Sequence, residues 1–252
     1  MTNSRQERSP GSWAKAAGWI VGIALLAACL FYAVRLPLAG FNSTATLRVY
    51  AFSTQAEVLS QAIFPAFEQA WEAENHKDLV IEAVYGPSGT LAGQINLGAP
   101  ADVAILSNSR HVDWLKIGKR LNANDEAILI GATPLVILTR EGNPLGIQDY
   151  SDLAQPDLRL VHADPRTSGV GEWAILGAYG NAYLPDEDAE AGKAQLKAIW
   201  QNVRLMGDSA RASLSLFELG AGDALLTYEQ DALMAEERNV PLEIIIPERT
   251  IV

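Results

Sequence analysis

Apolar and polar residues follow a pattern between residues 46 and 246 that changes repeatedly from the period of a strand to the period of a helix. The segment "TLRVYAF" (46–52) is strand-like, and residues 55–74 carry apolar side chains at helical spacing. The same pattern predicts further strands at 79–85, 103–106, 127–139, 158–161, 224–227 and 242–246. It predicts helices at 88–97, 111–116, 169–180, 189–201, 210–219 and 230–238, with a short helical turn at 151–154. Because strands alternate with helices, we expect an α/β fold with a mainly parallel sheet.

The N-terminal segment has a different pattern. Residues 1–17 are polar and basic, residues 18–34 ("GWIVGIALLAACLFYAV") are continuously apolar, and residues 36–44 have the composition of a short tether. A basic flank before an apolar helix predicts a cytoplasmic tail and a body outside the cytoplasmic membrane, on its periplasmic or extracellular face. Three alternatives stay open: an uncleaved membrane anchor, a cleaved signal, and a lipoprotein signal in which "LAAC" is the lipobox and Cys29 is lipidated.

Composition excludes several classes of function. The chain carries 19 Lys and Arg against 30 Asp and Glu, a net charge of -11, which argues against nucleic acid as a partner. Its one cysteine, Cys29, and its scattered histidines (76, 111 and 162) lack metal-ligand spacing, so we expect neither a metal site nor a cofactor. The sequence has no Gly-x-Ser-x-Gly elbow and no P-loop lysine, and it pairs no histidine with a plausible nucleophile, so we do not expect an enzyme.

Small polar residues recur where predicted strands lead into helices. The four junctions are Ser53-Thr54, "GPSGT" (86–90), "TSGV" (167–170) and "GDSA" (207–210). In an open α/β sheet such turns lie at the carboxyl ends of the strands, where these folds bind ligands. Helix starts offer free amides and a partial positive charge, so several of them aimed at one point would bind an anion without lysine or arginine. Ordinary helix capping is the alternative explanation for each junction taken alone.

From residue 46 to about residue 248 the chain resembles the periplasmic sulfate- and thiosulfate-binding proteins of ABC importers. The resemblance rests on "YGPSGTLAGQI" (85–95), "ADVAIL" (101–106), "REGNP" (140–144), "ADPRTSGVGEWAILGAYGNA" (163–182), "SARAS" (209–213) and "GAGDALLTYEQDAL" (220–233). The stretch "SGTLAGQINLGAPADV" (88–103) also resembles the molybdate-binding relatives. The resemblance implies a two-lobed "Venus flytrap" fold of the type II periplasmic binding proteins, which closes on a dehydrated tetrahedral oxyanion.

The resemblance also implies ligand-binding residues. In lobe I they are Ser53 and Ser88, and in lobe II they are Ser168, Gly169, Val170, Ala210 and Tyr228. Val170 stands where sulfate binders usually have a second glycine, and its amide can still donate. Tyr228 stands where they usually have a tryptophan, and its hydroxyl can donate as a tyrosine does in molybdate binders. Glu229, next to it, is either a structural partner or a proton acceptor that would admit hydrogen phosphate.

The implied organisation is an N-terminal signal or anchor and tether (1–44), lobe I (45–132 with 241–252) and lobe II (133–240). Family members usually continue for several dozen residues beyond "LEIIIPE", and that tail completes the first lobe, so the resemblance implies an undersized lobe I here. The implied function is capture of sulfate or thiosulfate for an ABC importer permease. A molybdate- or tungstate-binding protein and a membrane-tethered anion sensor are the alternatives.

Overall fold

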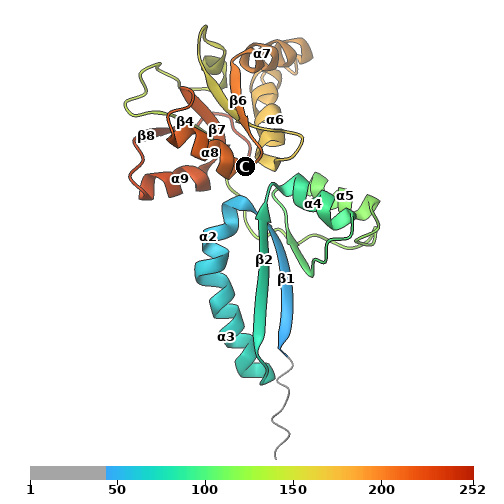
Figure 1. Ribbon diagram of the computed structural model, residues 1–252. Coiled ribbons are helices and arrows are strands. Elements are labelled where there is room, and N and C mark those ends of the chain that lie inside the picture. The colour runs from blue at the N-terminus through green and yellow to red at the C-terminus, as the bar shows by residue number, and fades with distance from the viewer. Residues whose placement is uncertain (1–43) are drawn as a thin grey trace, which may run out of the picture.

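The computed structural model describes residues 44–252, which form two lobes, each built on its own β-sheet (Figure 1). The predicted N-terminal hydrophobic helix, the tether up to residue 43 and Cys29 lie outside the described residues. The lower lobe in Figure 1 has a three-stranded sheet of order β2-β1-β3, and the upper lobe has a five-stranded sheet of order β6-β5-β7-β4-β8. We call them lobe I and lobe II. Between residues 44 and 252 no helix has the length and apolarity needed to cross a membrane.

Lobe I is a small parallel sheet with a long helical segment on one face and two short helices on the other. The strands are β1 (Ala45–Phe52), β2 (Leu79–Gly86) and β3 (Val103–Ile105), and both pairings are parallel. The long segment runs through η1 (Ser53–Gln55), α2 (Ala56–Val58), η2 (Leu59–Ile63) and α3 (Phe64–Asn75). The short helices are α4 (Ser88–Asn96) and α5 (Ser109–Ile117). The predicted strands and helices of this lobe are therefore present as far as residue 117.

Lobe II has a mixed sheet. Its strands are β4 (Leu135–Arg140), β5 (Leu160–Ala163), β6 (Val203–Gly207), β7 (Ala224–Tyr228) and β8 (Leu242–Ile245). Its helices are η3 (Tyr150–Ala154), α6 (Gly169–Tyr183), α7 (Ala189–Gln201), α8 (Ala210–Glu218) and α9 (Glu229–Glu237). Strand β5 is parallel to β6 and β7, but β4 is antiparallel to both β7 and β8. The prediction of mainly parallel sheets thus holds fully in lobe I and only partly in lobe II.

Three details of the prediction are wrong. Strand β8 pairs with β4, and the amide of Leu135 donates to the carbonyl of Ile251, so residues 241–252 belong to lobe II and not to lobe I. Strand β6 was not predicted. Only the second half of the predicted strand 127–139 is a strand, because within the described residues nothing pairs with 127–134, and Ile128 is 86% exposed. The described chain consequently passes from lobe I to lobe II once, between α5 and β4.

The buried core is concentrated in lobe II. Two clusters cover its sheet, one centred on Tyr150 and Leu160 beneath α6 and α7, the other on Leu214 and Phe217 of α8. Lobe I has two smaller clusters, one under α4 and α5 around Leu91 and the other under the long helix. A fifth cluster lies where the lobes meet, and it includes three of the predicted site residues.

Candidate anion site between the lobes

The candidate site is built from turns at the carboxyl ends of the strands. Ser88 is the first residue of α4 after β2, Gly169 opens α6 after β5, and Ala210 opens α8 after β6. Ser53 follows β1 directly, and Tyr228 ends β7 immediately before α9. The sheets therefore bring the predicted residues of each lobe to the edge that faces the other lobe, as the topological rule for open α/β sheets requires (Figure 1).

Three of the residues predicted for lobe II pack together. Val170, Ala210 and Tyr228 share one buried cluster with Leu135 and Ala163, and each is at most 5% exposed. Phe52, the residue before Ser53, packs against this cluster from lobe I, and its ring meets the Tyr228 ring edge-on with centroids 6.3 Å apart. Ser53 itself is half-buried. The structure thus gathers the donor groups of lobe II and places the end of β1 against them.

The caps of these helices distinguish a ligand site from ordinary capping. Helices α5 and α7 begin with Asn108 and Asp188, whose side chains accept hydrogen bonds from the first amides. At α6 the N-cap residue Ser168 is 3% exposed, yet its side chain accepts no capping hydrogen bond. At α8 the Ser209 hydroxyl accepts from the amide of Ala212 and leaves that of Ala210. Because first-turn amides have no partner within the helix, those of Gly169, Val170 and Ala210 remain available to a bound group.

The Tyr228 hydroxyl is the clearest sign of a missing partner. It is buried and forms no hydrogen bond of normal geometry with any described residue, although the Ser107 side chain lies close enough to lower its pKa slightly against the larger effect of burial. Burial raises the pKa of the phenol well above its usual range, so the group is a neutral donor at physiological pH. A buried donor without a partner is costly, on the order of 1–3 kcal/mol. An acceptor supplied by a ligand would remove that cost.

In lobe I, Ser88 is held firmly. It is 2% exposed, its Oγ accepts a hydrogen bond from the amide of Ser107 at 3.0 Å, and it lies 2.9 Å from Nδ1 of His111. Two of the three hydrogen-bonding positions of this hydroxyl, which has one hydrogen and two lone pairs, are therefore occupied. The contact with His111 corrects the sequence analysis, which paired no histidine with a hydroxyl nucleophile.

The lobes touch on one flank of the site through α4, α5 and α6. The amide of Gly89 donates to the carbonyl of Thr167 at 2.8 Å, and Nε1 of Trp173 donates to the carbonyl of Ser107 at 3.0 Å. Glu172 receives hydrogen bonds from two residues of lobe I, Asn108 and Arg110. A Cβ atom on Gly169 would clash with Oγ of Ser107, so glycine at 169 lets Ser107 approach without turning its hydroxyl away.

The lobes touch on the other flank through the long helix of lobe I. Thr54 Oγ1 donates to Oδ2 of Asp231 at 3.0 Å, and Arg211 pairs with Glu57 at 2.7 Å. Asp231 is fully buried, and burial raises its pKa to about 6. Contacts on both flanks hold the two lobes together around the helix starts, which is the arrangement expected of a closed binding protein.

The family follows from comparison with known proteins. The sequence profile described as "Bacterial extracellular solute-binding protein" matches residues 47–252. The chain belongs to this family. That membership agrees with a pair of lobes whose helix starts face one another.

The relatives and a solved structure narrow the comparison. The sulfate-binding protein of Synechococcus elongatus is 30% identical over 208 residues, covering 80% of this chain and 58% of that protein. The sulfate-binding protein of Salmonella typhimurium is 34% identical over 197 residues, covering 74% and 59% respectively. The sulfate-binding protein SubI from Mycobacterium tuberculosis H37Rv shares the fold with a TM-score of 0.74 at 23% identity, covering 82% of this chain and 72% of that one. The chain therefore spans less than two thirds of the length of the two sequence relatives.

Several residues at this candidate site were not predicted. Ser107 donates its amide to Ser88 Oγ and accepts at its carbonyl from Trp173, while His111 contacts Ser88 and lies close to Glu172. Ser107 follows β3, so the rule that strand ends meet at one edge would have included it if that strand end had been considered. Glu229 donates its amide to the carbonyl of Pro134, and a role for its carboxylate toward a ligand stays a prediction.

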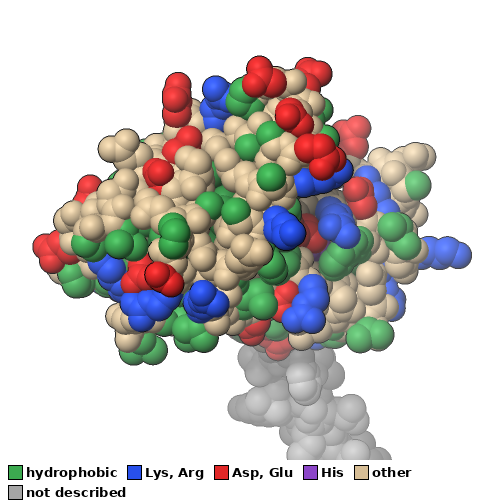
Figure 2. Space-filling model, turned by 90° about the horizontal axis from the view of Figure 1, so that it is seen from above, with side chains coloured by type: hydrophobic (Ala, Val, Ile, Leu, Met, Phe, Trp, Pro, Cys, Tyr) green, Lys and Arg blue, Asp and Glu red, His purple; other side chains and the backbone are tan. Residues whose placement is uncertain are grey.

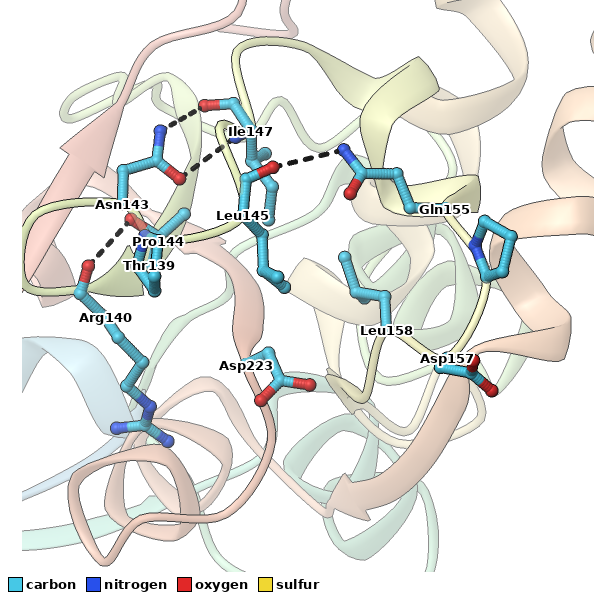
Figure 3. Close-up of a pocket in the computed structure, with 11 residues that line it drawn as sticks. Thr139, Arg140, Asn143, Pro144, Leu145, Ile147, Gln155, Asp157, Leu158 and Asp223 are labelled. Atoms are coloured by element: carbon cyan, nitrogen blue, oxygen red, sulfur yellow. Dashed lines mark hydrogen bonds between the residues drawn. The ribbon is translucent and has the colours of Figure 1, made fainter.

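A cavity of about 220 Å³ lies elsewhere, on lobe II, between β4, the loop after it and residues 155–158 (Figure 3). Its polar groups are already occupied. Arg140 donates to the carbonyls of Phe217, Ala221 and Gly222, and Asp223 pairs with Arg159. Figure 3 shows the Arg140 guanidinium extending away from Leu145 and Leu158. The guanidinium of Arg140 is bonded to backbone carbonyls and the lining includes the carboxylates of Asp157 and Asp223, so this cavity suits an anion less well than the site between the lobes.

Acidic and basic side chains are interspersed on the face of the molecule seen in Figure 2, without a continuous basic patch on that face. Among residues 44–252 no group of His, Cys, Asp and Glu has the arrangement of a metal site. The residues predicted for the candidate site offer neutral donors: amides, hydroxyls and a phenol.

Proposed function

We propose that this chain is an extracytoplasmic solute-binding protein that captures a tetrahedral oxyanion, sulfate or thiosulfate, and delivers it to the permease of an ABC importer. It binds and does not catalyse. The observation that carries the proposal is that the starts of α6 and α8, whose first amides are free, share one buried cluster with Tyr228, whose hydroxyl has no partner among the described residues. Relatives that carry the name sulfate-binding protein support the choice of anion.

The protein groups proposed to bind the anion come from both lobes. Lobe II offers the amides of Gly169, Val170 and Ala210, the hydroxyl of Ser168 and the hydroxyl of Tyr228, and lobe I offers the hydroxyls of Ser53 and Ser88. A hydrogen bond to a charged group contributes about 1.5–3 kcal/mol. Micromolar affinity needs about 8 kcal/mol, so five to seven such bonds suffice after the costs of ordering and association.

Selectivity follows from the kind of group that lines the site. Every protein group proposed to bind the anion is a hydrogen-bond donor, and a fully ionised dianion presents only acceptors. Hydrogen phosphate carries a proton that needs an acceptor, and without one it would be rejected. Molybdate and tungstate are also tetrahedral dianions, and Tyr228 in place of the tryptophan of sulfate binders keeps them as the second candidates. A sensor would use the same site and differ only in its membrane partner.

The proposed place of action is the outer face of the cytoplasmic membrane. The basic and apolar pattern of residues 1–34 supports a membrane-attached protein, held by that segment or by a lipid on Cys29, with residues 45–252 outside. The family description, "Bacterial extracellular solute-binding protein", supports the same side of the membrane.

A pair of buried tyrosines tests the proposal. Isothermal titration calorimetry of the full-length chain in detergent would compare sulfate, thiosulfate, molybdate and phosphate at equal ionic strength. We expect sulfate or thiosulfate to bind with a micromolar or lower Kd and Tyr228→Phe to weaken binding about tenfold, because it removes one charge-assisted hydrogen bond worth about 1.5 kcal/mol. Phosphate should bind far more weakly.

Tyr150→Phe is the matched control. The Tyr150 hydroxyl is also buried in lobe II, but it lies 3.1 Å from Oγ1 of Thr250 and faces no helix start. Its loss should cost about 1 kcal/mol of stability and leave anion affinity unchanged. The proposal fails if the folded wild-type chain binds none of the four anions, or if the two tyrosine variants lose affinity equally. Tight molybdate binding with weak sulfate binding would instead select the molybdate branch.

A further inference from the structure

The environment of Ser88 determines what its hydroxyl can do. A hydroxyl has one hydrogen to donate and two lone pairs to accept with. The amide of Ser107 occupies one lone pair at 3.0 Å, and His111 Nδ1 lies 2.9 Å away. If Nδ1 carries no proton, the Ser88 hydroxyl donates to it and is lost to a ligand. If Nδ1 carries a proton, it fills the second lone pair, and the Ser88 hydrogen must point elsewhere.

His111 itself is buried and incompletely bonded. The side chain is 0% exposed, and its second nitrogen, Nε2, forms no hydrogen bond with a described residue. The ring is held edge-on by Trp114 with centroids 4.7 Å apart. A Cβ atom at position 89 would lie 3.0 Å from Nε2, so Gly89 keeps that side of the ring open. The ring is fixed in place while its proton arrangement is not.

A carboxylate from the other lobe lies close to the free nitrogen. Oε1 of Glu172 lies 3.8 Å from Nε2 of His111, and Arg110 is 3.1 Å from the same oxygen. Glu172 is 9% exposed and also accepts from Asn108. Ser88, His111 and Glu172 thus form a chain that crosses from lobe I to lobe II. When the neutral ring carries its proton on Nδ1, Nε2 is an acceptor that faces the carboxylate, so both ends of the chain are satisfied only if the ring holds a second proton.

This inference rests on the proposed function. We propose that His111 is a positioning residue that turns the Ser88 hydroxyl hydrogen toward the bound anion. When the anion binds, the His111–Glu172 pair takes up one proton. With two protons on the ring, Nδ1–H donates to Ser88 Oγ and Nε2–H points toward Oε1 of Glu172, which must move closer than its present 3.8 Å to accept the hydrogen bond. The proton comes from solvent, and no bond between heavy atoms changes. The added positive charge lies next to a dianion held by neutral donors.

Burial and the nearby charge of Arg110 keep this second proton off His111 while the site is empty. Burial, with Arg110 as a second cause, lowers the pKa of His111 to about 4, and burial raises the pKa of Glu172. The histidine is therefore neutral at pH 7 in the anion-free form, and its contact with Glu172 is not an ion pair. The charged or titratable groups that face the pair are Arg110 from α5, the Tyr228 phenol at the end of β7 and the anion itself, while Trp114, Ser88 and Asn108 are neutral. A dianion beyond Ser88 shifts the balance toward uptake of the proton.

Calorimetry can count this proton. Sulfate would be titrated into the full-length chain at pH 6.5 in buffers of different ionisation heat, none of them an inorganic oxyanion. We expect the wild-type binding heat to depend on the buffer with a slope of about 0.5–1 proton taken up per anion. His111→Asn keeps an amide donor close to Nδ1 and cannot titrate, so it should bind with at most a tenfold loss and take up no proton.

His162→Asn is the matched control. His162 is equally buried, in lobe II, where its Nδ1 contacts the carbonyl of Ala163 and its ring packs on Trp200. That variant should keep both the affinity and the proton count of the wild type. Two outcomes overturn the inference while sulfate binding remains intact. One is a wild-type binding heat that does not depend on the buffer. The other is a proton count that is unchanged in His111→Asn. Absence of all anion binding would instead overturn the proposed function.

Discussion

Both lobes hold donor groups toward the candidate anion site, but lobe II does so on a more deeply buried sheet than lobe I. In lobe II, strands β5 and β7 are buried along their whole length, because α6 and α7 cover one face of the sheet and α8 and α9 the other. In lobe I, β2 is mostly exposed or half-exposed, and no residue of α3 is buried. The starts of α6 and α8 are thus fixed by a packed core, while Ser53 and Ser88 stand on a thinner support.

This difference in packing predicts which part of the anion site is preorganised. Donors held by a close-packed core keep their geometry without a ligand, whereas donors on a lightly packed lobe depend more on contacts across the cleft. The contacts from Glu57, Thr54, Asn108 and Arg110 to lobe II supply such support. We therefore expect lobe II to determine stability and the contacts between lobes to tune affinity.

Two phenylalanines test the difference in packing. Phe217 in lobe II is 0% exposed and Phe67 in α3 of lobe I is 45% exposed. Phe217→Ala should lower the free energy of unfolding by about 3–5 kcal/mol, because it leaves a cavity in the core, and Phe67→Ala by less than about 1 kcal/mol. Urea unfolding followed by circular dichroism measures both. Equal losses would show that lobe I is covered as well as lobe II, and the comparison would be wrong.

A buried carboxylate between the lobes gives the next largest effect. The folded-state pKa of Asp231 is raised by burial from 3.8 to about 6, so between about pH 4 and pH 6 the folded chain binds more protons than the unfolded chain. The protonated form is the favoured one, and its stabilisation is lost as the pH rises through 6. The loss is about 3 kcal/mol, since each pKa unit corresponds to about 1.4 kcal/mol.

Asp231→Asn isolates this contribution, because asparagine stays neutral and its Oδ1 can still accept from Thr54 and Thr227. The stability of the variant minus that of the wild type should increase by about 3 kcal/mol between pH 3 and pH 8. Urea unfolding at a series of pH values gives the difference. A difference that is constant with pH would mean that Asp231 is not desolvated where the lobes meet.

An ion pair between the lobes gives the smallest effect. Arg211 and Glu57 join lobe II to lobe I with side chains 21% and 42% exposed, while Lys193 and Glu190 form an exposed pair within α7. Partly exposed pairs contribute up to about 1 kcal/mol, so Glu57→Gln should weaken anion binding by about two- to fivefold by opposing closure. Glu190→Gln should leave the Kd unchanged. Equal Kd values for the two variants, measured by calorimetry, would show that this contact does not support the closed form.

The sequence predicted local features well and non-local ones poorly. The starts at Ser88, Gly169 and Ala210 were correct because glycine, serine and the switch in apolar period mark a helix start within a few residues. Residues 127–134 were predicted as a strand because they are apolar, but a strand also needs a partner, and no described strand pairs with them. For the same reason β8 was assigned to lobe I, whereas its partner is β4.

The site shows the same limit. Tyr228 and the residues of the four junctions came from local patterns and from family resemblance. His111 and Glu172 are 61 positions apart on different lobes, and Ser107 enters the site only because β3 lies beside β1. No spacing along the chain reports such contacts, so their roles required the fold.

Locating the anion directly tests the central claim. The protein would be crystallised with selenate, a tetrahedral dianion whose selenium atom gives an anomalous signal at a single position. The account predicts one strong peak between the lobes, within hydrogen-bond distance of the amides of Gly169, Val170 and Ala210 and of the hydroxyls of Ser88 and Tyr228. A fully occupied peak elsewhere, with these donors left unpaired, would contradict it.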